Sequence, residues 1–208
     1  MSLEERLAKL EAKLEELENV RQIEKLVGKY IYWLHIQEFE KIKEHCWAKK
    51  APDVSLEASD SGQFIGQESV RRFYDPDGVV GALSKVKGGF TMHLACSPII
   101  EIAADGKTAK SIWQSPGCAG DKWIWGTIII DFIKEDGEWK IWHYNFTPFF
   151  RTPYHKGWME APAEGSLASD LADGPPTRWN PYNKEKTGKE LFKHLPPAPE
   201  PYETYESE

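Results

Sequence analysis

His93 is the residue whose chemistry and setting best suit proton transfer. It lies in the segment Thr91–Ala95, which reads as part of a strand, where every second side chain points to the same face. A neutral imidazole takes up and returns a proton near pH 7 without help from a metal. We therefore predict that His93 is a general acid or base. The alternative is a structural histidine held by hydrogen bonds.

Aromatic side chains are unusually frequent, with nine Trp, nine Phe and eight Tyr. Flat rings favour flat ligands, and each ring contact adds about 0.5–1.5 kcal/mol beyond the buried area. Trp113, Trp123 and Trp125 lie on adjacent predicted strands and are predicted to form pocket walls; the alternative for each is a core or subunit contact. Tyr30 lies about one turn before His35 on a predicted helix and is predicted to share its face. Together these aromatic side chains predict an aromatic or polycyclic ligand.

Other chemical signals are missing from the sequence. There is no His-Glu-x-x-His motif, no Cys/His cluster, no glycine-rich phosphate loop and no Gly-x-Ser-x-Gly element. We therefore expect neither a metal nor a cofactor. Glu57 and Asp60 follow the first predicted strand and are interpreted as an exposed loop pair, with a pocket carboxylate as the alternative.

Composition narrows the class of protein. The 26 basic and 33 acidic residues give a net charge of −7, which argues against binding to nucleic acid or to an anionic membrane. Three cysteines without a CxxC motif exclude a disulfide scaffold. The apolar runs are far shorter than the roughly 20 residues of a membrane span, and the charged start is unlike a signal peptide. A cytoplasmic location is expected.

Three regions follow along the chain. Residues 1–20 form an amphipathic helix with leucines at heptad spacing, which predicts either a helix lying on its own domain or a short coiled coil between subunits. Residues 21–150 form the folded domain. Residues 151–208 are rich in proline yet contain large apolar side chains, so we predict an irregular C-terminal arm that packs on the domain or on a neighbouring subunit.

Within residues 21–150, helices come first and long strands afterwards. Residues 90–103 read as one strand, and Asp-Gly pairs in the later connections are typical of hairpin turns. This order predicts an α+β fold with a mainly antiparallel sheet. The strands exceed the usual length, so the sheet should curve strongly at bulges or at Gly126.

The set of elements resembles the nuclear transport factor 2-like superfamily, in its SnoaL-like and scytalone dehydratase-like branch. The resemblance covers roughly residues 18–150. Its carriers are the helix IEKLVGKYIYWLHIQEFEKI, the segments FIGQESVRRFY and TMHLACSPIIEI, and the terminal DGEWKIWHYN. It implies a cone-shaped α+β barrel, in which a curved sheet wraps the N-terminal helices around one deep pocket. It also implies a homodimer or homotrimer.

The resemblance also suggests roles for single residues. TMHLA is similar to the dehydratase segment that carries a catalytic histidine, here His93. His35 stands where relatives often have an aspartate, and a histidine there can only share a hydrogen bond or supply a second acid or base. Trp125 replaces a second dehydratase histidine. On the last strand the resemblance implies that three alternating residues face the pocket: Trp142, Tyr144 and Phe146. Tyr144 is the only one of them with a hydroxyl group.

The leading functional hypothesis is therefore a cofactor-independent lyase, either a dehydratase or a formaldehyde-releasing enzyme. Its substrate is expected to be a small phenolic or other ring-containing molecule, such as a lignin-derived compound. His93 would take a proton, while Tyr144 or His35 would stabilise the oxyanion and assist the leaving group. The alternatives are an isomerase or cyclase on the same scaffold, a non-catalytic small-molecule binding protein, or an interaction protein.

Overall fold

The computed structural model describes residues 1–83, 85–160, 170–180 and 182–205. Its elements, in chain order, are α1 (Leu3–His35), α2 (Phe39–His45), β1 (Ser55–Ala58), β2 (Gly62–Ile65), α3 (Gly66–Phe73), α4 (Val79–Leu83), β3 (Phe90–His93), β4 (Cys96–Ile102), β5 (Thr108–Gly120), β6 (Lys122–Glu135), β7 (Glu138–Pro153) and a 3-10 helix (Gly188–Leu191). No helix among the described residues is long and apolar enough to cross a bilayer.

The strands form one curved sheet in the order β2-β1-β7-β6-β5-β3, and β4 pairs with β5 beside β3. All neighbours are antiparallel except β1 and β7, which run parallel. The α+β prediction is therefore confirmed. Residues 90–103 do not form one strand, because the ladder breaks after His93 and β4 starts at Cys96.

Turn chemistry explains the meander of long strands. Asp136 and Gly137 between β6 and β7 both have positive φ, which suits a two-residue hairpin turn. The ladder of β6 and β7 shifts register at Gly126, where an added Cβ would lie 2.6 Å from the Thr147 carbonyl oxygen and 2.9 Å from a Phe146 ring carbon. Glycine is needed there because the two strands approach closely. The sequence predicted curvature at bulges or at Gly126, and the register shift beside Gly126 is one such bulge.

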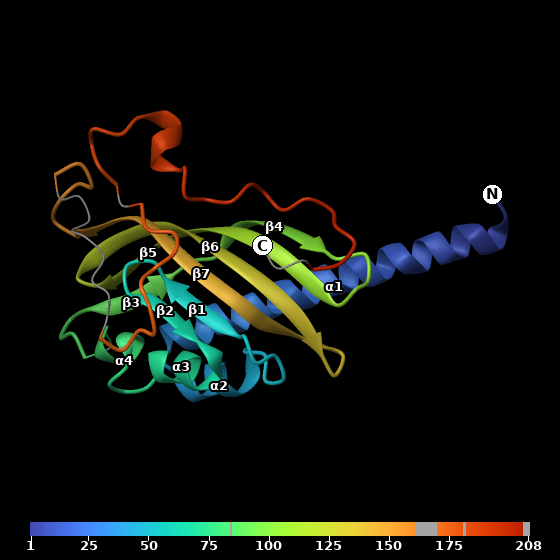
Figure 1. Cartoon of the computed structure of the whole chain (residues 1–208), viewed down its shortest axis with the longest axis horizontal. Coiled ribbons are helices and arrows are strands. Elements are labelled where there is room, and N and C mark those ends of the chain that lie inside the picture. The colour runs from blue at the N-terminus through green and yellow to red at the C-terminus, as the bar shows by residue number, and fades with distance from the viewer. Residues whose placement is uncertain (84, 161–169, 181, 206–208) are drawn as a thin grey trace.

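Helix α1 packs its second half against the inner face of the sheet. Its buried residues recur at helical spacing and join the main hydrophobic core, which continues onto the strands with Ile128, Ile130 and Phe132. The first half of α1 projects beyond the body of the molecule, as Figure 1 shows. Leu3 and the four further heptad leucines are exposed, so the helix does not lie on its own domain, and that alternative was wrong.

The C-terminal arm crosses the outer face of the sheet (Figure 1). Among the described residues it makes hydrogen bonds with its own chain: the Gln63 and Ile65 amides donate to Gly174 and Asp173, and the Ala104 amide donates to Tyr202. The expected arm also includes residues 161–169, 181 and 206–208, which lie outside the described part of the chain.

Candidate active site

A cavity of about 640 Å³ lies between the inner face of the sheet and helices α1, α3 and α4. Most of its wall is apolar, supplied by side chains such as Leu34, Leu56 and Val80. Its polar groups include residues from four different segments, namely Tyr30 from α1, Asp60 from the turn between β1 and β2, Thr91 and His93 from β3, and Tyr144 and Arg151 from β7. Separate elements must therefore fold together before this set of groups exists.

His93 is the last residue of β3 and lines the cavity. Its ring meets Phe146 edge to face, with the centroids 5.0 Å apart and the planes at 78°. Burial, the positive charge of Arg151 and the neighbouring His35 together lower the pKa of His93 to about 3, and burial is the largest of these causes. The imidazole is therefore neutral at physiological pH and free of a proton at one ring nitrogen.

His35 ends α1 and contacts the backbone of His93 rather than its ring. The His93 amide lies 3.0 Å from His35 Nε2 and donates to it in one tautomer. In the other tautomer Nε2 donates to the His93 carbonyl oxygen, 2.8 Å away. His35 is not among the residues that line the cavity. It couples the end of the first helix to β3 and so holds the catalytic candidate in place.

Three tyrosines gather beside the cavity, and two of them, Tyr30 and Tyr144, line it. The Tyr30 and Tyr74 hydroxyls are 3.0 Å apart, and the rings of Tyr30 and Tyr144 are 5.4 Å apart. Burial is the main cause that raises the pKa of all three well above 10. These hydroxyls stay protonated at neutral pH, so Tyr30 and Tyr144, which line the cavity, offer hydrogen-bond donors to a ligand.

An ion pair that the sequence interpretation missed lies in the cavity wall. Arg151 Nη2 binds Asp60 Oδ2, and both side chains are mostly buried, with 22% and 15% of their surface exposed. Asp60 had been interpreted as an exposed loop residue, which was wrong. The alternative reading, a pocket carboxylate, describes its position. Arg151 places a permanent positive charge close enough to His93 to act on its pKa.

Two bulges in β7 decide which of its side chains face inward. Asp131 pairs with His143 and Phe132 with Ile141, so Trp142 is an extra residue in the ladder. Each extra residue reverses the alternation of the strand. Trp142 therefore lies outside the cavity, against the prediction, and its indole N–H donates to Asp53 over 2.8 Å.

The second bulge brings Arg151 into the cavity. Trp125 pairs with Phe150 and Gly126 with Pro148, which leaves Phe149 as the extra residue. Tyr144 and Phe146 face inward before this bulge, and Arg151 faces inward after it. A strictly alternating strand would have turned Arg151 to the outer face, which is why strand periodicity could not find it.

The three central tryptophans do not line the cavity as predicted. Trp123 and Trp125 are 52% and 48% exposed, because the inward positions of β6 are the even ones, such as Ile124 and Ile128. Trp113 does face the core but is packed into it, with its indole N–H donating to Ser111 Oγ over 2.7 Å. Of the predicted ligand-binding residues, Tyr30 and Phe146 line the cavity.

The C-terminal arm completes the rim of the cavity of its own chain. Trp179 and Lys156, both beyond β7, are among the lining residues. The arm is held on the outer face by the buried carboxylate of Glu57. This carboxylate accepts from the Thr177 amide (2.9 Å), the Thr177 hydroxyl (2.6 Å) and the Arg178 amide (3.2 Å).

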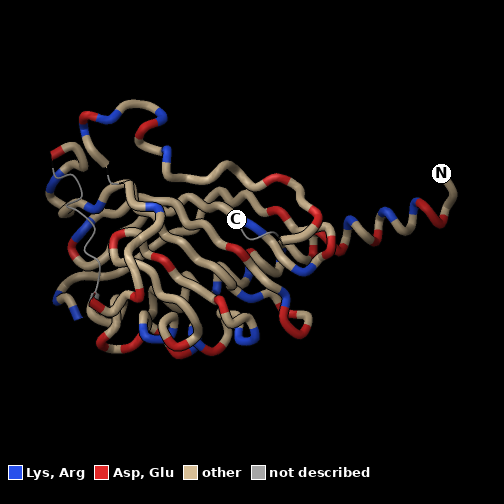
Figure 2. The backbone as a smooth tube through the Cα atoms, in the orientation of Figure 1, with Lys and Arg blue, Asp and Glu red and all other residues tan. Residues whose placement is uncertain are grey.

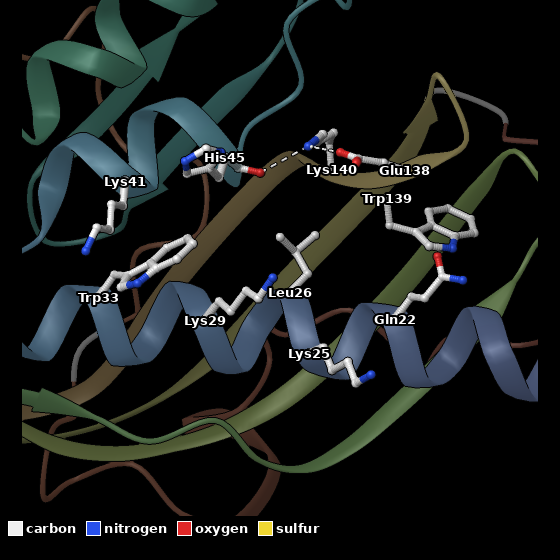
Figure 3. Close-up of a pocket in the computed structure, with 10 residues that line it drawn as sticks. All are labelled: Gln22, Lys25, Leu26, Lys29, Trp33, Lys41, His45, Glu138, Trp139 and Lys140. Atoms are coloured by element: carbon white, nitrogen blue, oxygen red, sulfur yellow. Dashed lines mark hydrogen bonds and ion pairs between the residues drawn. The ribbon is translucent and has the colours of Figure 1, made fainter.

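A second hollow of similar volume lies on the outside, between α1, α2 and the start of β7 (Figure 3). Lysines surround it, and Trp33 and Trp139 form part of its wall. Lys140 donates to the His45 carbonyl oxygen and to Glu138, as the dashed lines show. This hollow is more open than the inner cavity and contains no buried acid or base. The inner cavity is therefore the candidate active site.

Within the described residues no group of three histidine, cysteine or acidic side chains is placed to hold a metal ion. Cys46 is buried, and burial raises the pKa of its thiol to about 12, so it is not an activated nucleophile. The groups that line the cavity include a neutral imidazole, two phenols and an arginine paired with a carboxylate.

Solved structures share this architecture. A candidate scytalone dehydratase from Novosphingobium aromaticivorans superposes with a TM-score of 0.58 at 16% identity, covering 74% of this chain and 97% of its own. Hexachlorocyclohexane dehydrochlorinase LinA-type3 from Novosphingobium barchaimii gives 0.55 at 16%, covering 68% and 93%. An NTF2-like protein with a cystatin-like fold from N. aromaticivorans gives 0.54 at 16%, covering 67% and 88%. The cone of a curved sheet around helices is thus the NTF2-like fold.

The family follows from the sequence match. The family model of the SnoaL-like domain matches residues 15–145, which is more than half of the chain. The protein therefore belongs to the SnoaL-like family. A comparison with curated protein sequences gives no significant match.

Proposed function

We propose that this protein is a cofactor-independent lyase that removes a proton from a small ring-containing molecule and expels a leaving group from it. The observation that carries the proposal is the neutral imidazole of His93 in the wall of a cavity that the phenol of Tyr144 also lines. The SnoaL-like family and the fold shared with a dehydrochlorinase and a candidate dehydratase support this class of reaction.

His93 would act as the base. It accepts a proton from carbon or oxygen of the substrate, and the electron pair of the broken bond forms the new double bond as the leaving group departs. A histidine with a pKa of about 3 is a weak base. The substrate proton must therefore be acidic already, or must be lost together with a good leaving group.

The substrate itself helps this step. Burial and Arg151 lower the pKa of His93 because both disfavour an imidazolium ion. An anion that forms between His93 and Arg151 raises the pKa of His93, because a negative charge there stabilises the positive charge of an imidazolium ion. The imidazole therefore gains basicity at the stage of the reaction where a proton is being transferred.

Tyr144 and Tyr30 would receive the negative charge. Their raised pKa values keep both phenols protonated, so they donate hydrogen bonds to an oxyanion or to a departing hydroxide, alkoxide or halide. Arg151 adds a fixed positive charge that does not depend on pH. His35, bound to the backbone of His93, is proposed as a positioning residue.

The cavity favours a substrate with one or two rings. Its volume of about 640 Å³ lies within the range of small-molecule sites, and its wall combines apolar side chains with the face of Phe146. The polar ends provide for a hydroxyl, a carbonyl or a leaving halide. Loss of water or of formaldehyde from a phenolic, lignin-type compound fits this description. Isomerisation would use the same base with the proton returned to another carbon.

The test is a search for product in a panel of ring-containing alcohols, aryl diols and halides, followed by mass spectrometry. We expect H93Q to lower kcat/KM by about 10²–10⁴-fold, and Y144F to lower it by a smaller factor. H143Q is the matched control. His143 also has a lowered pKa, but it lies on the outer face of β7, where its Nδ1 is 2.9 Å from the Ser55 hydroxyl and its ring stacks on Trp142.

The control should retain activity within about threefold, since His143 lies outside the cavity. Turnover that is equal in wild-type protein and H93Q would overturn the assignment of His93. A panel that gives tight, saturable binding of ring compounds without any product would instead identify a non-catalytic binding protein.

A further inference from the structure

The first half of α1 has an apolar stripe that the described residues of its own chain leave exposed. Five leucines at heptad positions, each between 55% and 79% exposed, form one stripe: Leu3, Leu7, Leu10, Leu14 and Leu17. The helix begins with a capping box, in which the Glu5 amide donates to Ser2 Oγ and the Ser2 amide donates to the Glu5 carboxylate. This turn starts a helix that extends about 22 Å from Leu3 to Leu17.

The stripe faces away from the body of the molecule. At 3.6 residues per turn, the leucines are centred about 150° around the helix axis from the buried stripe of Ile23–Leu34. The helix is continuous, so no bend brings the leucines back onto the sheet (Figure 1). The body therefore lies on one side of α1, and the leucines lie on the other. Only another molecule can cover them.

The charged residues beside the leucines indicate which kind of partner can bind to the stripe. In the heptad that places Leu7 at position a and Leu10 at position d, the e positions are all acidic and the first two g positions are basic: Glu4, Glu11 and Glu18 at e, Arg6 and Lys13 at g. Figure 2 shows both charges alternating along the projecting helix. Arg6, Glu11, Lys13 and Glu18 make no ion pair with the described residues of their own chain.

This pattern is complementary to itself in one orientation. In a parallel coiled coil, a g residue of one helix meets the e residue five positions later on the other, which pairs Arg6 with Glu11 and Lys13 with Glu18. In an antiparallel coil, e residues face e residues and g residues face g residues, so like charges meet. We propose that α1 forms a parallel coiled coil with another copy of the same chain, through the leucine stripe.

The path of a second helix is open beyond the leucines. Arg21, Gly28 and Tyr32 continue the same side of α1 and are exposed, and no atom lies within 4 Å of where a Cβ on Gly28 would be. The two bodies would lie on opposite outer sides of the coil, because each packs on the face of α1 that points away from the leucines. Neither cavity is blocked by this arrangement.

A membrane surface is a poorer partner for this helix. Residues 1–18 contain six acidic residues (Glu4, Glu5, Glu11, Glu15, Glu16, Glu18) and three basic ones (Arg6, Lys9, Lys13), a difference of −3. Anionic lipid attracts basic segments and repels acidic ones. The e and g charges are also arranged in rows beside the leucines, which an unpatterned lipid surface does not require.

The first experiment uses charge reversal in the full chain, with molar mass measured by light scattering over a range of concentrations. E11K/E18K makes every inner g–e' contact basic, and R6E/K13E makes every one acidic. Each variant alone should assemble at least tenfold more weakly than the wild-type chain. An equimolar mixture of the two should recover the wild-type mass, because the opposite rows then face each other. Circular dichroism of each variant confirms that the helix is intact.

The second experiment fixes the orientation. L17C in a C96S/C118S background should form an intermolecular disulfide under mild oxidation, since equal positions face each other in a parallel coil. Disulfide formation only in a mixture of L3C and L14C, which pair a d position with an a position, would show an antiparallel coil and overturn the proposal. So would a molar mass that is the same for wild type, both charge variants and their mixture. Binding of the wild-type chain to phosphatidylserine vesicles with no change between charge variants would assign the stripe to membranes instead.

Discussion

The two faces of the same sheet use similar residues for different purposes. The inner face places His93, Tyr144 and Phe146 around a cavity, whereas the outer face places His143, Trp123 and Trp125 toward solvent or the arm. Both faces are rich in rings and each has a histidine of lowered pKa. Residue type therefore does not identify the site; enclosure by helices on one side of the sheet does.

The two faces also differ in what keeps their polar groups buried. Inside, polar groups are few and fixed, as in the ion pair of Arg151 with Asp60. Outside, Glu57 is buried only because the arm covers it and supplies donors from Thr177 and Arg178. The inner face depends on packing, and the outer face depends on a segment without regular structure. Three measurements on stability sharpen this contrast.

The largest effect is expected from the inner core. Ile128 is completely buried and pairs with Phe146 across the ladder, so Ile128→Ala should lower the free energy of unfolding by about 2–5 kcal/mol. Ile99 in β4 is 43% exposed, and Ile99→Ala should cost about 0.5 kcal/mol. Urea unfolding followed by fluorescence measures both. Equal losses for the two variants would contradict the difference between the faces.

A smaller effect is expected where the arm is attached. Glu57→Gln replaces a carboxylate that accepts hydrogen bonds from Thr177 and Arg178, and should lower the free energy of unfolding by about 1–3 kcal/mol. Cleavage of the arm by a protease at low concentration should become faster while the body stays intact. Glu138→Gln, at an exposed hairpin, is the control and should change neither quantity. An arm that is cleaved at the same rate in both variants would show that Glu57 does not hold it.

The third effect concerns pH. Folding keeps the pKa of His93 at about 3, against about 6.5 in an unfolded chain. Between these values the unfolded chain binds a proton that the folded chain does not, so the free energy of unfolding falls as the pH drops from 6.5 toward 3. His93→Gln should reduce the difference between the urea midpoints at pH 7 and pH 4.5.

His143→Gln is the comparison for the outer face. The pKa of His143 is lowered by burial, but Asp131 and Asp53 oppose that shift. Its replacement should therefore flatten the pH dependence less than the replacement of His93. A drop in midpoint that is as steep in His93→Gln as in the wild-type chain would show that His93 does not stay neutral in the folded protein.

Much of the fold could be predicted from local patterns. The helical stripe from Ile23 to Leu34, the Asp136-Gly137 turn and the glycine at position 126 each act through neighbours in the sequence or through backbone geometry. The break between β3 and β4 was missed, because apolar residues continue through Leu94 and Ala95 while the pairing with β5 does not. The pattern of apolar residues predicts which side chains are buried, but it does not predict which backbone groups pair across the sheet.

The candidate site was predicted in part for the same reason. Tyr144 and Phe146 lie in the cavity with His93, as the family resemblance implied, and Tyr30 joins them from α1. Trp123, Trp125 and Trp142 lie outside it, and Arg151 and Asp60 were missed. A single charged residue in an apolar run, such as Arg151 after Phe150, was the signal available. The face of the sheet to which the Arg151 side chain points depends on a bulge that no sequence motif predicts.

By itself, the sequence determined the α+β class, the order of elements, the hairpin turns and the presence of a histidine on a strand, since these depend on local spacing and residue type. The tertiary structure alone decided which side chains share the cavity. Two extra residues in β7 each reverse the direction of every side chain that follows, and they exist only through pairing with β6. The pairing of Arg151 with Asp60 likewise joins residues that only the folded, curved sheet brings together.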